Sequence, residues 1–221
     1  MKKLVFAPLV LAFAANTALA ANSVDLRVTG TITPAACDIS LAGGDFDLGT
    51  ISAQDLNATT ETDLGSSTTK QLNIVCSGAT QVAFKAIDNR ASSRPSGVTG
   101  TSSIFGMGMD SANNPIGYYK IFSWPANAVA NGSPAVFRHS NDEGATWTEA
   151  AKDASVSFVA YDIQQRIYAI DPTSGGTGQP TPITSASAII QVRPIIQPEN
   201  TLDTSSEIAI DGSATIELVY L

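Results

Sequence analysis

The sequence predicts an all-β protein, a β-sandwich with long loops, and three features of the chain carry this prediction. Apolar and polar residues alternate with a period of two over many short stretches, as in strands with one buried face. Glycine and proline, 17 and 11 of the 221 residues, separate these stretches. No window keeps the apolar spacing of three, four and seven residues that a helix needs, so we expect helices of a single turn at most. Many short strands between Gly/Pro turns indicate a sandwich or a barrel.

The first twenty residues predict a secretory signal peptide, residues 1–20. Lys2 and Lys3 precede an apolar run over residues 4–15, and small residues at 18 and 20 offer a cleavage site. The run is too short to cross a bilayer, although an N-terminal membrane anchor is the alternative. We therefore expect an exported protein, and removal of the two lysines lowers its net charge from −8 to −10.

The composition excludes several functions. Acidic residues outnumber basic ones, 20 to 12, which argues against binding to nucleic acid or to an anionic membrane. A single histidine and two cysteines leave few ligands for zinc or iron, so we expect no metal and no other cofactor. With 43% hydrophobic residues, the chain is too apolar to be disordered.

The first predicted strand lies near the mature N-terminus. Four apolar residues alternate there with polar or small ones: Val24, Leu26, Val28 and Ile32. A short apolar element follows at 46–51. The stretches 72–76 and 82–86 also alternate, and the Ser77-Gly78 turn between them predicts a hairpin.

Residues 89–150 are expected to form a loop-rich middle. Its first part, 89–114, is rich in Ser, Gly, Thr and Asn and predicts a long surface excursion. An apolar run at 116–122 and a hairpin with its turn at 141–144 interrupt the loops.

The last third shows the clearest alternation. Three strands are expected there, over residues 156–160, 167–170 and 186–192. Asp211-Gly212 predicts a tight hairpin turn between 208–210 and 214–220. No linker-like tract divides the chain, so we expect residues 21–221 to form one sandwich domain.

The two cysteines predict a disulfide. Cys37 and Cys76 are 39 positions apart, and export would place them in an oxidising compartment. A catalytic thiol needs a neighbouring His or Lys to lower its pKa, and nothing near either cysteine suggests that role. We expect a structural bridge.

A second motif predicts a local turn. Ser140, Asp142, Gly144, Thr146 and Trp147 fit the pattern Ser-x-Asp-x-Gly-x-Thr-Trp, which resembles the Asp-box of sialidases. In that family the box is a structural turn that recurs through propeller blades, away from the chemistry, whereas it occurs once here. We expect a structural turn, and a secreted glycosidase is an alternative that depends on this motif alone.

No other pattern predicts an enzyme. Asp142 and Glu143 are adjacent, so on a strand they would point to opposite faces and could not act as an acid/base pair. His139 has no Gly-x-Ser-x-Gly nucleophile to serve. Four aromatic residues could instead form a sugar-binding platform, although packing is their commoner role: Tyr118, Tyr119, Trp124 and Trp147.

The chain ends inside an amphipathic strand, at Val219-Tyr220-Leu221. A long apolar edge strand that nothing covers tends to aggregate. Either an earlier strand of the chain or a strand of another chain is therefore expected to pair with it.

Three segments together resemble chaperone–usher fimbrial subunits (pilins). Residues 30–37, Gly-Thr-Ile-Thr-Pro-Ala-Ala-Cys, are similar to their first strand, and Cys76 at the end of 71–76 falls at a similar spacing. Residues 214–221 resemble their terminal strand, including the penultimate tyrosine, whereas the middle of the chain matches much less well.

The resemblance implies an immunoglobulin-like sandwich that lacks its seventh strand and leaves a hydrophobic groove beside the last strand. It also implies that a periplasmic chaperone fills the groove with a strand of its own, which the N-terminal extension of the next subunit later replaces. This is β-augmentation, in which backbone hydrogen bonds supply affinity and alternate side chains supply register. Ile216, Leu218, Tyr220 and Leu221 would then contact the chaperone or the donor strand.

The function implied is that of a fimbrial-type subunit, exported to the periplasm and then placed in a fimbrium or at the cell surface. Its partners would be the chaperone, the usher and other subunits. Because residues 24–32 are assigned to the first strand, they cannot also be donated, and we expect a minor or terminal subunit that only accepts a strand. The alternative is an adhesin module that binds a host or surface glycan through the loops of 89–150.

Overall fold

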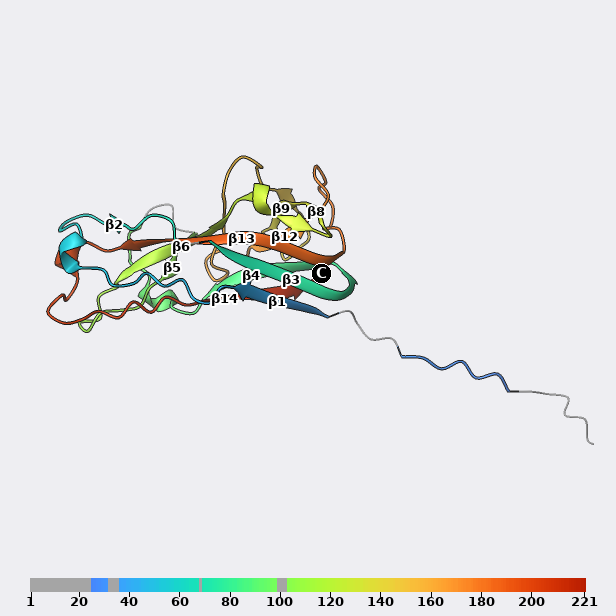
Figure 1. The fold of residues 1–221 in the computed structure, drawn as a ribbon, viewed down its shortest axis with the longest axis horizontal. Helices are drawn as coiled ribbons and strands as arrows, with labels where there is room; N and C mark the ends of the chain where they lie inside the picture. Colours follow the sequence, from blue (N-terminus) through green and yellow to red (C-terminus); the bar gives the residue numbers. More distant parts are fainter. Residues whose placement is uncertain (1–24, 32–35, 68, 99–102) are drawn as a thin grey trace, which may run out of the picture. The chain divides into compact units, whose positions relative to one another are not determined.

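A computed structural model describes residues 25–31, 36–67, 69–98 and 103–221. The chain divides into two compact units, Met1–Thr33 and Pro34–Leu221. The second unit contains two antiparallel sheets, which confirms the predicted all-β sandwich (Figure 1). This unit begins at Pro34 rather than at residue 21, and the predicted signal peptide lies outside the described residues. No helix in the described ranges is long and apolar enough to cross a membrane.

Each sheet has a main path of five strands. The first follows the order β1 (Cys37–Ala42), β3 (Lys70–Thr80), β13 (Ile183–Ile196), β6 (Gly117–Ser123) and β11 (Val156–Ser157). The second follows β10 (Thr148–Glu149), β9 (Val136–Ser140), β12 (Ile167–Asp171), β4 (Val82–Asp88) and β14 (Ala214–Tyr220).

Short elements complete the second unit. Strands β2 (Thr62–Asp63) and β7 (Val129–Ala130) pair with β13, β5 (Phe105–Gly106) pairs with β6, and β8 (Ser133–Pro134) pairs with β7. The helical segments of the described chain include four single 3-10 turns, η1 (Ala53–Asp55), η2 (Ala91–Ser93), η4 (Pro125–Asn127) and η5 (Glu199–Thr201).

The predicted alternation places the core between the sheets. On β3, Leu72 and Ile74 are buried, whereas Val75 between Ile74 and Cys76 is 59% exposed. Four buried residues of β13 alternate in the same way: Ala186, Ala188, Ile190 and Val192. The centre is aromatic, since the Phe158 ring lies 5.3 Å from that of Phe84 and 4.9 Å from that of Tyr168 between centroids.

A smaller cluster covers the outer face of the second sheet. Trp147 packs there against Ala83, Ile167 and Ala169. The neighbours Phe84 and Tyr168 belong to the main core, so β4 and β12 bury residues on both faces.

The expected disulfide is confirmed. Cys37 and Cys76 are directly opposite each other in the β1–β3 ladder and are bonded. The bridge therefore ties β1 to its one strand partner in the described chain.

The expected first strand differs from the structure. Residues 25–31 carry no strand, Leu26 and Val28 are 88% and 91% exposed, and Val24 and Ile32 lie outside the described residues. The first strand of the sandwich is β1 instead. Alternation of apolar and polar residues shows that a segment can form a strand. A strand also needs a partner strand for the hydrogen bonds of its backbone N–H and C=O groups. The argument that this segment is already used, and so cannot be donated, is therefore wrong.

The hairpin expected at Ser77-Gly78 is also wrong. β3 runs on to Thr80, and the chain then crosses at Gln81 into β4 of the other sheet. The hairpin expected at Asp211-Gly212 does not form either, because residues 208–213 carry no strand and β14 pairs with β4. The hairpin around 141–144 does form, through the pairing of β9 with β10.

Two irregular stretches differ from expectation as well. The short element at 46–51 is not a strand. The stretch 89–114 is not a surface excursion throughout, because Ile104, Phe105 and Met107 are 3%, 0% and 1% exposed. Isolated apolar residues in a polar segment can thus be anchors to the core.

Candidate functional site

The edges β1 and β14 border one groove. In the described chain β1 pairs with β3 alone, and β14 pairs with β4 alone. Residues of both edge strands line the groove, among them Ile39 and Leu41 of β1 and Ile216 of β14. The two sheets are therefore not joined by a strand along this side of the sandwich.

Two irregular segments form much of the wall. The first follows β1 and contributes residues between Gly44 and Leu56, and the second precedes β14 and contributes residues between Leu202 and Ser213. Figure 1 shows both segments running from the edge strands toward the end of the unit that carries η1. Each lies outside the ladders, so the backbone along the groove is not organised as a sheet.

The floor of the groove is the inner face of the first sheet. It consists mainly of core residues from β3, β6 and β13: Leu72, Ile121, Ile190, Val192 and Ile196. Half-buried apolar residues of the walls face the same space: Ile39, Phe46, Leu48, Leu56 and Ile208. The groove has a volume of about 1060 Å³. It is thus an apolar trough that reaches the sandwich core.

The segment before β14 is held by specific contacts. The Asp211 N–H donates to the Met107 carbonyl at 3.0 Å, and Arg90 donates Nε–H to the Asp211 carbonyl at 3.1 Å and forms an ion pair with its carboxylate. A Cβ at Gly212 would lie 2.9 Å from the ring of Tyr119, so this position has no room for a larger residue. Burial, together with the nearby Asp88 carboxylate, raises the pKa of Tyr119 and keeps its phenol neutral in the groove lining.

A hydrogen-bond contact of Tyr220 connects the two edge strands outside the groove lining. The Tyr220 hydroxyl accepts a hydrogen bond from the Cys37 N–H at 2.8 Å and lies 3.4 Å from the Cys37 carbonyl, to which it donates. This contact joins the start of β1 to the end of β14 across the gap between the sheets.

The rim of the groove is acidic. The charged residues in its lining are Asp45, Asp47 and Glu207, all carboxylates. Two cations contact the wall segments: Lys70 donates to the Gly43 carbonyl and lies 5.3 Å from the centre of the Phe46 ring, and Arg90 is paired with Asp211.

The C-terminal residues expected to contact a partner have different positions. Ile216 lines the groove, and Leu218 packs against the core. Tyr220 forms the contact with Cys37, and the Leu221 N–H donates to the Gln81 carbonyl. The structure therefore places Ile216 in the groove but not the other three.

The Asp-box-like residues form one turn between β9 and β10. Ser140 Oγ donates to Asp142 Oδ1 at 2.6 Å and accepts from the Gly144 N–H at 2.8 Å. Thr146 donates both its N–H and its hydroxyl to the Asp142 carboxylate, at 2.9 and 2.6 Å. Gly144 has a φ of 95°, and its carbonyl accepts the Trp147 indole N–H at 2.9 Å. The turn thus positions Trp147 over the outer face of the second sheet.

These hydrogen bonds affect the Asp142 carboxyl. Donation by Ser140 and then by Thr146 lowers the pKa of Asp142 to about 2. Both carboxylate oxygens accept hydrogen bonds from within the turn, which agrees with a structural role for Asp142.

The remaining candidate groups do not converge on a reaction centre. Tyr118 and Trp147 are buried and Tyr119 belongs to the groove lining, so of the four aromatic residues only Trp124, 43% exposed, presents a large open face. Burial lowers the pKa of His139, and the Arg166 charge adds to this effect. Within the ranges that the structure describes, no three His, Cys, Asp or Glu residues are grouped to hold a metal.

The sequence patterns missed most of the groove walls. Phe46, Leu48 and Ile208 were expected to belong to strands or to lead into a turn. In the structure their segments form no strand. The available signal was the apolar character of these residues alone, because the lack of a partner strand is shown only by the tertiary structure.

Comparison with known proteins places the chain in a family. Residues 26–105 match a family described as "Protein of unknown function (DUF1120)". The Escherichia coli K12 protein named "Uncharacterized protein YhcF" is 30% identical over 233 residues, which cover 95% of each chain. The chain belongs to the YhcF family.

A second E. coli K12 protein, "Protein GltF", is 25% identical over 242 residues, covering 96% of this chain and 94% of the relative. The similarity to YhcF and GltF spans nearly the whole chain. The DUF1120 match includes β1, β3 and β4 with the disulfide.

Proposed function

We propose that this protein is a fimbrial-type structural subunit that completes its sandwich with a strand supplied by another chain. The observation that carries the proposal is the apolar groove between β1 and β14, each with one strand partner in the described chain. An added strand could pair with these edges and cover the exposed core, which combines backbone hydrogen bonds with apolar burial.

The proposal includes an order of partners. A periplasmic chaperone would supply the first strand after export and removal of residues 1–20. The usher and other subunits would follow, and the protein would finish in a fimbrium or at the cell surface. This role requires no catalysis and no cofactor.

The N-terminal segment supports donation as well as acceptance. Residues 25–31 carry no strand, and in an extended chain Leu26 and Val28 would share one face with Val24. The proposed subunit is therefore not restricted to a terminal position.

A peptide that copies residues 21–34 tests the proposal. Added in excess to the mature protein, it should bind and raise the melting temperature, because a ligand of the native state stabilises that state. No binding and no rise in melting temperature would contradict the strand-accepting role.

Three variants identify the binding surface. Leu41→Glu and Ile210→Glu alter groove residues that are 39% and 37% exposed, so both proteins should fold and lose the peptide. Leu64→Glu is the matched control, because Leu64 is 36% exposed but does not line the groove. Equal loss in all three variants would show that the peptide binds elsewhere or nonspecifically.

A further inference from the structure

The groove differs from an ordinary apolar trough in the sign of its rim. Asp45 and Asp47 lie on the wall that follows β1, and Glu207 lies on the wall that precedes β14. Both walls therefore carry negative charge, and among the residues that the structure describes the lining includes no basic one.

Neighbouring cations offset this charge only in part. Lys70 is engaged by the Gly43 carbonyl and the Phe46 ring, and Arg90 is paired with Asp211. Asp47 accepts a hydrogen bond from the Gly49 N–H at 2.8 Å, which holds its carboxylate in the wall without neutralising it. The chain as a whole adds to the negative field, with a net charge of −8.

A strand in the groove would present its side chains in two sets. Residues at alternate positions would point to the apolar floor, and those between them would point outward, level with the walls. The outward-pointing side chains of the added strand would lie near the carboxylates of the walls. Positively charged side chains there would be attracted, and negatively charged ones would be repelled.

From this geometry we infer that the groove selects a cationic amphipathic strand, one with apolar residues at alternate positions and Lys or Arg between them. The occupant is a segment of a partner protein, and the inference rests on the proposed strand-accepting function. The apolar floor supplies affinity for any such strand, whereas the acidic rim discriminates among strands by charge.

Two peptides that differ only in outward charges test the inference. Both copy residues 21–34 with blocked ends and keep Val24, Leu26 and Val28. The cationic peptide carries D25K and T29K beside the native Arg27, and the anionic peptide carries R27E and T29E beside the native Asp25. At low salt the mature protein should bind the cationic peptide on the order of tenfold more tightly, from exposed ion pairs of ordinary strength. The preference should shrink in ~0.5 M salt, which screens charges over a few ångströms.

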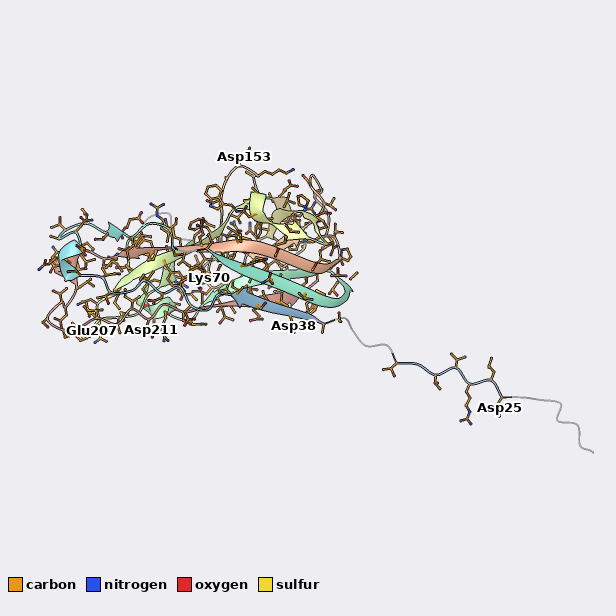
Figure 2. All side chains as sticks on the ribbon, viewed as in Figure 1. Asp25, Asp38, Lys70, Asp153, Glu207 and Asp211 are labelled. Atoms are coloured by element: carbon orange, nitrogen blue, oxygen red, sulfur yellow. A yellow bond between two sulfur atoms is a disulfide. The ribbon has the colours of Figure 1, made fainter. Side chains whose placement is uncertain are left out.

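Matched neutralisation separates the rim from the overall charge. The rim variant carries D45N, D47N and E207Q, and the control variant carries E61Q, E143Q and D153N, none of which lines the groove. All six side chains are on exposed or half-buried positions, and each triple removes three negative charges. Figure 2 shows Asp153 on a loop well away from Glu207. The rim variant should lose the preference, and the control variant should keep most of it.

Each outcome has a distinct meaning. Equal binding of both peptides by the unmodified protein would overturn the charge inference and leave the strand-accepting function intact. Failure of both peptides to bind would contradict the function itself. Equal loss of preference in the two triple variants would assign it to net charge and overturn selection by the rim.

Discussion

Removal of the Cys37–Cys76 disulfide should lower the free energy of unfolding by about 4 kcal/mol. The bridge closes a loop with a sequence separation of 39 residues, and the chain-entropy relation for a loop of that length gives this value at 25 °C. The effect arises mainly in the unfolded chain, which becomes freer without the crosslink. A native-state contribution has the same sign, because the bridge ties the edge strand β1 to its ladder with β3.

The assay is urea unfolding of the double variant C37A/C76A, followed by tryptophan fluorescence and circular dichroism. Trp147 is 4% exposed and packs on the second sheet, so its emission reports loss of the sandwich. Alanine is chosen because Cys76 is buried, and a serine hydroxyl there would add an unrelated cost. The midpoint should fall, and the urea dependence should steepen because an uncrosslinked chain exposes more surface on unfolding.

The wild-type protein unfolded in the presence of a reductant is the control, and it should match the variant. A free energy of unfolding within about 1 kcal/mol of the oxidised protein would refute the loop-closure reasoning, since this is well below the range for such a loop. Peptide binding by the variant then shows whether the groove wall depends on the bridge.

Three further predictions concern a buried ion pair, a closely packed glycine and a hydrogen-bonded carboxylate. Asp171→Asn should lower the free energy of unfolding by ~3–5 kcal/mol, because it leaves the buried Arg138 guanidinium without a negatively charged partner. Nε and Oδ2 are 3.2 Å apart, and the two side chains are 2% and 1% exposed. Urea unfolding measures this, and a loss below about 1 kcal/mol would contradict an essential buried pair. Gly117→Ala should lower stability by ~1–3 kcal/mol or more, because its Cβ would lie 2.2 Å from the Ile195 carbonyl oxygen; an unchanged melting temperature would show that the strands separate freely. Asp142 has a pKa lowered from 3.8 to about 2, so its contribution is complete above pH 3.8 and is lost as the pH falls through 2. The melting temperatures of wild type and Asp142→Asn should therefore differ at pH 5 and converge near pH 2, and a constant difference would refute this assignment.

Much of the sandwich could be predicted, because apolar residues at alternate positions of a strand mark the face that is buried. The alternation at 72–76 and 186–192 identified β3 and β13 with their buried faces, and that at 214–220 identified β14, whose inner residues are only half-buried. Two cysteines in a chain expected to be exported were enough to predict the disulfide.

Pairing could not be predicted in the same way. The stretches 72–76 and 82–86 look like the arms of a hairpin, yet β3 and β4 belong to different sheets. A strand's alternation specifies which side chains are buried but not which backbone accepts its hydrogen bonds, because every strand offers the same donors and acceptors.

The candidate site depended on this missing information. The sequences of 24–32 and 214–220 alternate equally well. In the structure 214–220 pairs with β4, whereas the described part of the first segment, 25–31, carries no strand. The groove is defined by two edges and two irregular walls that are distant in sequence, from Ile39 to Ile216. The sequence by itself determined the strand-forming segments, the disulfide and the acidic charge of the chain. Only the tertiary structure decided which edges lie unpaired beside each other and that acidic residues line the space between them, because that depends on how distant segments meet.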